Sequence, residues 1–257
     1  ASNMVLAAYG SDTGGSIRQP AAFTGIVGMK PTYGRVSRSG LIAMASSLDQ
    51  IGPFAKNAED VEILYEVLRG RDKLDSTTIN DDTYEVGDAK KIIGVPRDFF
   101  EELLTEDVKK NFEATLKKFE SLGYKIKDIK LPHLKYSLAV YYILMPAEVS
   151  SNLARFDGVK YGLHVDGDNS IDDYFQTRGR GFGKETRRRV ILGTYVLSSG
   201  YYDAYYGQAQ NMKSAITKEM REAFDDVDFI LTPTTPTPAF KFGEKSDPLS
   251  MYLADIF

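Results

Sequence analysis

Residues 10–18 have the sequence GSDTGGSIR, in which a serine follows two glycines. They come after a short apolar run at 4–9, and such a run ending at a glycine is typical of a buried strand. Glycine lets backbone amides approach a ligand at conformations that other residues resist. The pattern therefore predicts that Ser16 presents a nucleophilic hydroxyl beside amides able to stabilise an oxyanion. A tight turn after a buried strand, with no chemical role, explains the same residues.

The composition narrows the class of protein. A chain of 257 residues can bury one sizeable core. Its net charge of −4 gives no overall positive field that would attract a polyanion, so nucleic-acid binding as the main function is disfavoured. A local basic patch is still possible, because residues 187–189 are three consecutive arginines. The chain has no cysteine, which excludes disulfides, thiolate metal sites and a cysteine nucleophile. It has no apolar stretch long enough to span a bilayer and no recognisable signal peptide, so we expect a cytoplasmic or organelle-matrix location.

Hydrophobic spacing predicts an α/β fold, with a mixed β-sheet covered by helices on both faces. The helices are expected at 58–69 after an Asn57 cap, between Thr105 and Gly123, at 135–153, and at 184–223 with a break near 198–200. The strands are expected at 92–96, 124–131 and 228–231, and the loops at 71–90 and 232–240. The strand–helix–strand order between residues 92 and 131 predicts a parallel pair of strands.

Several longer motifs resemble the amidase signature family, whose hallmark is the Gly/Ser-rich stretch around Ser16. Within that family they look most like the glutaminase subunits of tRNA-dependent amidotransferases. The motifs are KPTYGRVSRSGL (30–41), SSLDQIGP (46–53), DSTT (75–78), SSNLARFDG (150–158), RRRVILGTYVLSSGYYDAYY (187–206), PTTPTPAF (233–240) and DPLSMYLADI (247–256).

The resemblance implies a Ser–Ser–Lys triad in which Ser16 attacks the carboxamide of glutamine. Thr13, Gly14 and Gly15 would then supply or shape the oxyanion donors. It also implies one amidase domain over residues 1–257 that is incomplete. The triad lysine and the bridging serine are expected to precede residue 1, and a further segment is expected after residue 257. We therefore expect an internal fragment with negligible turnover when it is isolated.

Recognition of free glutamine requires a cation for its α-carboxylate and an anion for its α-ammonium group. Arginine suits the first because its planar fork matches a carboxylate. The resemblance places this arginine at Arg189, with a one-residue slip to Arg188 left open, and it places the carboxylate at Asp255 and a substrate-contacting tyrosine at Tyr141. An arginine on a helix surface, an aspartate at a helix end and a tyrosine in the core are the structural alternatives.

No base for Ser16 is evident in the chain itself. His133 and His164 lie outside any triad motif, and Lys30 is the candidate substitute for the lysine that the resemblance places upstream. Asp12 and Arg18 flank the loop with opposite charges. We expect them to pair and hold the turn, with a role in tuning the nucleophile as the alternative.

The resemblance implies a heterotrimer that converts Glu-tRNA(Gln) to Gln-tRNA(Gln). Its B subunit would bind the tRNA and activate the glutamate with ATP and magnesium, and its small C subunit would wrap around the glutaminase. No metal or organic cofactor is expected in this chain, and no membrane contact. A stand-alone amidase acting on another carboxamide is the alternative, as is an amidase-like interaction protein. A phosphate-binding loop is disfavoured because no Gly-Lys-Ser/Thr follows the glycines.

Overall fold

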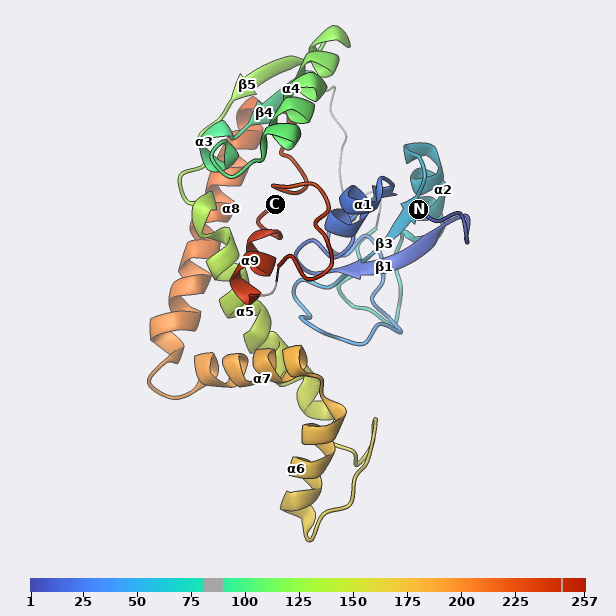
Figure 1. Ribbon diagram of the computed structural model, residues 1–257, viewed down its shortest axis with the longest axis vertical. Helices are drawn as coiled ribbons and strands as arrows, with labels where there is room; N and C mark the ends of the chain where they lie inside the picture. The colour runs from blue at the N-terminus through green and yellow to red at the C-terminus, as the bar shows by residue number, and fades with distance from the viewer. Residues whose placement is uncertain (81–89, 246) are drawn as a thin grey trace. The chain divides into compact units, whose positions relative to one another are not determined.

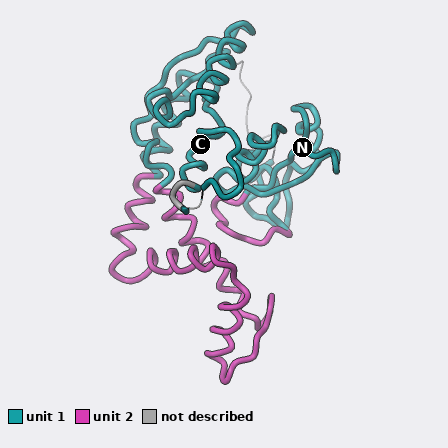
Figure 2. Tube along the Cα trace, viewed as in Figure 1, with its two compact units in different colours: residues 1–39, 50–138, 213–257 teal, residues 40–49, 139–212 magenta. Residues whose placement is uncertain are grey.

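The chain contains both helices and β-strands interspersed along its length, which confirms the α/β class (Figure 1). The computed structural model describes residues 1–80, 90–245 and 247–257, so positions 81–89 of the predicted loop 71–90 lie outside the described residues. The chain divides into two compact units (Figure 2). Unit 1 comprises residues 1–39, 50–138 and 213–257, and unit 2 comprises residues 40–49 and 139–212. Neither unit is continuous in sequence, and the single incomplete amidase domain stays a prediction.

A three-stranded antiparallel sheet in unit 1 leads into the Ser16 loop. Its order is β1 (Ala8–Asp12), β3 (Gln50–Ala55) and β2 (Val27–Gly28). The strand predicted at 4–9 was placed wrongly, because Met4 and Leu6 are 85% and 94% exposed. The cause is pairing: β3 runs antiparallel to residues 8–12, from Ala8 opposite Phe54 to Asp12 opposite Gln50. Only the last two residues of the apolar run, Ala8 and Tyr9, belong to the paired strand.

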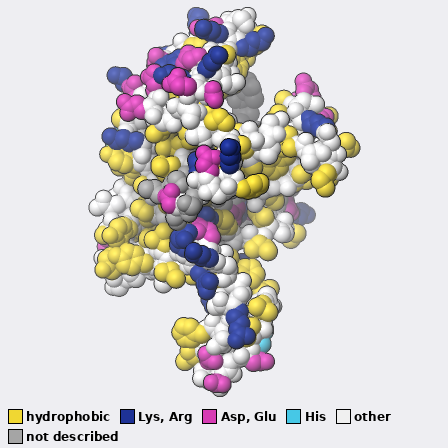
Figure 3. All heavy atoms as spheres, in the orientation of Figure 1, with side chains coloured by type: hydrophobic (Ala, Val, Ile, Leu, Met, Phe, Trp, Pro, Cys, Tyr) yellow, Lys and Arg dark blue, Asp and Glu magenta, His cyan; other side chains and the backbone are white. Residues whose placement is uncertain are grey.

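A second, parallel sheet in unit 1 has the order β5 (Lys125–Asp128), β4 (Ile92–Val95) and β6 (Phe229–Ile230). The predicted parallel pair is confirmed, and α4 (Glu106–Ser121) connects β4 to β5 (Figure 1). Phe112 and Leu116 lie on the apolar stripe of α4 and pack into a buried cluster with strand residues of β4. The charged side chains of this region lie on the surface, where both signs are interspersed (Figure 3).

The Asn57 cap is confirmed, since its side chain accepts a hydrogen bond of 2.8 Å from the Asp60 amide. The break predicted near 198–200 is also confirmed, and a short π-helix, η4 (Tyr202–Gly207), follows it.

Four helices were not predicted from the sequence. They are the short helices at 18–24, 97–100 and 248–253 and the longer helix at 170–181. The remaining helices are α1 (Arg18–Thr24), α2 (Ala58–Leu68), α3 (Arg97–Phe100), η2 (Leu134–Tyr136), α5 (Ser137–Asn152), η3 (Leu153–Arg155), α6 (Ser170–Gly181), α7 (Lys184–Leu197), α8 (Gln208–Asp226) and α9 (Pro248–Leu253). No helix among the described residues has the length and hydropathy needed to cross a membrane.

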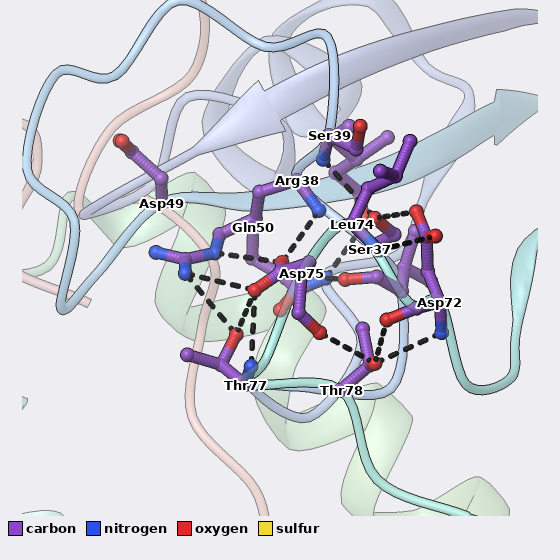
Figure 4. Close-up of polar contacts among 12 residues, drawn as sticks. Ser37, Arg38, Ser39, Asp49, Gln50, Asp72, Leu74, Asp75, Thr77 and Thr78 are labelled. Carbon is purple, nitrogen blue, oxygen red and sulfur yellow. Dashed lines mark hydrogen bonds and ion pairs between the residues drawn. The ribbon is translucent and has the colours of Figure 1, made fainter.

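The DSTT motif at 75–78 forms a structural polar network in unit 1 (Figure 4). Arg38 donates to the Asp75 carboxylate from its amide at 2.9 Å and from its guanidinium at 3.1 and 3.2 Å. These hydrogen bonds hold the pKa of Asp75 far below its ordinary value. Nearby, Ser37 donates to Asp72 at 2.6 Å, and the Thr78 hydroxyl accepts from the Asp72 amide at 2.9 Å. The network ties the loop after β2 to the segment after α2.

Candidate active site

Ser16 lies in the turn between the end of β1 at Asp12 and the start of α1 at Arg18. Its side chain is exposed, whereas the flanking residues Gly15 and Ile17 are buried. Gly15 has φ of +128°, a conformation that side chains strongly disfavour, so glycine is required at this position. The hydroxyl of Ser16 is therefore held at the surface of a rigid turn instead of being packed into the core.

The buried carboxylate of Asp12 stabilises this turn through hydrogen bonds to its backbone amides. Its Oδ1 accepts from the Gly15 amide at 2.7 Å, and its Oδ2 accepts from the Ile17 amide at 3.0 Å. The guanidinium of Arg18 adds two hydrogen bonds to the same carboxylate, at 3.0 and 3.2 Å. Burial acts to raise the pKa of Asp12, but the hydrogen bonds and charge of Arg18, with the two amides, outweigh it and lower that pKa. The predicted pairing of Asp12 with Arg18 is confirmed.

These contacts also bear on the three predicted oxyanion residues. Because the Gly15 amide donates to Asp12, Gly15 shapes the loop, and its N–H points at a carboxylate of the protein. Thr13 and Gly14 are half-buried and lie between this carboxylate and the nucleophile in sequence. Their role as donors stays a prediction.

The structure brings Asp255 to the Ser16 loop within unit 1. Gln19, in the first turn of α1, donates from Nε2 to the Asp255 carboxylate and, at 2.9 Å, to the Ala254 carbonyl. A Cβ built on Gly15 would lie 3.9 Å from Oδ1 of Asp255. The carboxylate predicted to bind the substrate ammonium group thus lies beside the predicted nucleophile loop, although 236 positions separate it from Gln19.

Tyr141 and Arg189 lie close to Met145 in unit 2. Tyr141, on α5, packs against the buried cluster that contains Met145. Arg189, on α7, places Nη1 3.8 Å from the Met145 sulfur and donates from Nε to Glu185 at 2.9 Å. Arg188 also pairs with Glu185, but its side chain is 39% exposed against 24% for Arg189. The inward position favours Arg189 over Arg188 for the predicted role.

The candidate bases within the chain have other partners. His133 contacts Glu219 through both its ring and, at 3.1 Å, its amide, and His164 contacts Asp166 at 3.1 Å. Burial lowers the pKa of Lys30, and the charge of Arg18 lowers it further against the opposing effect of Asp12. Its Nζ donates to the Pro31 carbonyl at 2.8 Å. Among the described residues, no cluster of acidic or histidine side chains could hold a metal ion.

The family model described as Amidase matches residues 1–257. The chain belongs to the amidase family. The chain is 54% identical over 265 residues to the A subunit of the glutamyl-tRNA(Gln) amidotransferase of Desulfatibacillum aliphaticivorans, with 100% of this chain and 55% of the relative covered. It is 53% identical over 264 residues to the corresponding protein of Thermodesulfovibrio yellowstonii, with 100% and 54% covered.

Solved amidase structures have the same fold. The crystal structure of the A subunit of the glutamyl-tRNA(Gln) amidotransferase from Thermotoga maritima superimposes with a TM-score of 0.76 at 45% identity, over 99% of this chain and 52% of that one. A crystal structure of an amidase gives a TM-score of 0.72 at 28% identity, over 98% and 52%. The resemblance expected from the motifs is confirmed. The chain spans about half the length of the curated relatives that it matches.

Two residues that sequence reasoning did not select contact the predicted site residues. Gln19 holds Asp255, and Glu185 holds Arg189. Glu185 had a signal in the sequence, because it precedes Arg189 by four residues on a predicted helix, and such residues lie side by side. Gln19 had none, since nothing in a single sequence points to a partner so far along the chain.

Proposed function

We propose that this chain is part of the glutaminase component of a glutamyl-tRNA(Gln) amidotransferase. The observation that carries the proposal is the meeting of the Ser16 loop with Asp255 through Gln19. This arrangement supports a site in which Ser16 acts as the nucleophile and Asp255 binds the ammonium group of the substrate. The relatives, which are named as A subunits of that amidotransferase, support the choice of substrate.

In the proposed reaction, Ser16 Oγ attacks the side-chain carboxamide carbon of glutamine. The amide C–N bond breaks, the hydroxyl proton reaches the departing nitrogen through a base, and ammonia leaves behind a glutamyl ester on Ser16. Water then hydrolyses this ester to glutamate. The base and the bridging serine would be the lysine and serine expected in a preceding part of the full-length protein, while Asp12 keeps the loop rigid.

In this proposal the other residues bind the amino-acid end of glutamine. Asp255 takes the α-ammonium group, Arg189 takes the α-carboxylate, and Tyr141 contacts the substrate. Thr13 and Gly14 provide oxyanion donors. The chain itself uses no metal or organic cofactor. The B and C subunits of the amidotransferase would complete a heterotrimer in the cytoplasm or an organelle matrix, with the B subunit binding tRNA, ATP and magnesium.

Isotope transfer tests this function directly. The full-length protein with its partner subunits is supplied with Glu-tRNA(Gln), ATP and glutamine carrying ¹⁵N in its side-chain amide. We expect the label in the amide of Gln-tRNA(Gln), measured by mass spectrometry of the released amino acid. Label that appears only as free ammonium, with no Gln-tRNA(Gln) formed, would instead support a stand-alone amidase.

Substitution of Arg189 tests the binding assignment. Arg189→Ala removes the bidentate partner of the α-carboxylate, so we expect kcat/KM for glutamine to fall about 100-fold. Hydrolysis of a simple amide without an α-carboxylate should change little. The matched control is Arg188→Ala, which removes the neighbouring guanidinium on the same helix and should spare glutamine. Equal losses on both amides would remove Arg189 from the recognition role.

A further inference from the structure

The side chain of Gln19 links two parts of the proposed site that are far apart in sequence. Its amide nitrogen has two hydrogens, and its two acceptors are the Ala254 carbonyl at 2.9 Å and the Asp255 carboxylate. One acceptor is backbone and the other is side chain. Together they restrain both the position of this segment and the orientation of the carboxylate.

Gln19 is itself fixed to the nucleophile loop. Its backbone amide donates to the Gly15 carbonyl at 2.8 Å, which closes the turn that contains Ser16. The neighbouring Arg18 is tied to Asp12, so the base of Gln19 cannot shift without disturbing the loop. On the other side, the Asp255 amide donates to the Tyr252 carbonyl at 3.0 Å, which closes the turn after α9. Gln19 therefore joins two ordered turns.

We infer that Gln19 is a positioning residue that holds Asp255 at a fixed distance from Ser16 and thereby makes the site selective for amides with an α-ammonium group. The inference rests on the proposed function. A carboxylate has two oxygens with about four lone-pair sites, so Asp255 can accept both from Gln19 and from a substrate ammonium group. The Gln19 amide is bonded to Gly15, the residue before Ser16. The distance between the Ser16 hydroxyl and the Asp255 carboxylate is therefore set by the turn and by the side chain of Gln19.

The chemistry of this contact predicts which substrates depend on it. Glutamine carries the α-ammonium group, whereas glutaramate is the same molecule without that group. A site with Asp255 in place should prefer glutamine, and a site with Asp255 displaced should lose that preference. Hydrolysis of glutaramate should be spared, since the Ser16 loop is held by Asp12 independently of Gln19.

The test uses the full-length protein with its partner subunits. Gln19→Met keeps the length of the side chain but removes both donors. We expect the preference for glutamine over glutaramate, as a ratio of kcat/KM values, to fall about tenfold, chiefly through KM for glutamine. Gln19→Glu replaces the donors with a negative charge and should cause at least the same loss. Thr24→Val, in the same helix and exposed, is the matched control and should leave the ratio unchanged.

A double-mutant cycle separates positioning from general damage. On an Asp255→Asn background, Gln19→Met should reduce the preference no further, because the group that it positions is gone. An unchanged preference in Gln19→Met, or an equal loss for glutamine and glutaramate, would overturn the inference. Absence of any preference in the wild-type protein would overturn the proposed function as well, which distinguishes the two failures.

Discussion

Replacing Ser16 with alanine is expected to abolish the release of ammonia from glutamine while preserving the amidation of Glu-tRNA(Gln) by added ammonium ion. Under the proposed function, the alanine variant lacks the oxygen that attacks the carboxamide, and loss of a serine nucleophile lowers turnover by about ten-thousand-fold or more. The second half-reaction needs only ammonia, which ammonium chloride supplies. Because Ser16 is exposed on its turn, the substitution leaves no cavity in the core.

Both half-reactions are measured on one preparation of the full-length complex. Glutamate release reports the glutaminase, and Gln-tRNA(Gln) formed with ammonium chloride reports the amidation. Ser11→Ala is the matched control, since Ser11 is an exposed serine of β1 in the same stretch. Loss of both half-reactions in Ser16→Ala, or glutaminase activity that persists, would contradict the assignment of Ser16.

The second large effect is expected for Asp12→Asn. The asparagine has the same shape but places an N–H₂ group against donors from Gly15, Ile17 or Arg18, so at least one of these donors loses its acceptor. We expect a loss of stability of about 2 kcal/mol, which is less than the roughly 3–5 kcal/mol for breaking a fully buried ion pair because Arg18 is partly exposed. We also expect glutamine hydrolysis to slow about 100-fold, since the nucleophile loop loses its support.

The stability difference should depend on pH in a defined direction. The pKa of Asp12 is lowered in the folded protein, so its contribution is fully present above the ordinary aspartate pKa of about 4 and is lost as pH falls through the folded pKa. Urea unfolding of wild type and variant should therefore converge as the pH is lowered below about 4. Asp60→Asn, at an exposed aspartate of α2, is the control. A gap that widens on acidification would contradict this account.

Local signals predicted much of the fold. The Asn57 cap marked the start of α2, and the apolar spacing ending at Phe119 marked α4, because both depend on neighbours within a few residues. The strand at 4–9 was misplaced because hydrophobicity does not specify which residues pair with β3. The helix α6 was missed because residues 170–181 are rich in polar side chains and contain two glycines, which weaken a helical pattern.

For the candidate site, the sequence predicted local features better than it predicted contacts between distant residues. The GSDTGGS motif indicated the turn on which Ser16 is exposed, and the pairing of Asp12 with Arg18 followed from opposite charges near that turn. The hydrogen bond from Gln19 to Asp255 depends on the packing of the segment after α9 beside α1, which is a tertiary contact that local sequence does not specify. The division of the chain into two units, each made of separate stretches of sequence, likewise depends on tertiary contacts.

The contact between Gln19 and Asp255 has a consequence for the synthesis of the protein. A ribosome adds about 5–20 residues per second, so the 236 positions between these residues take roughly 12–47 seconds to translate. During that interval the emerging chain already has Asp12, Arg18 and the serine turn, which need only local contacts. It still lacks the carboxylate that would anchor an amino acid. Under the proposed function, a nascent polypeptide therefore lacks the group that binds the α-ammonium of glutamine until translation has passed residue 255.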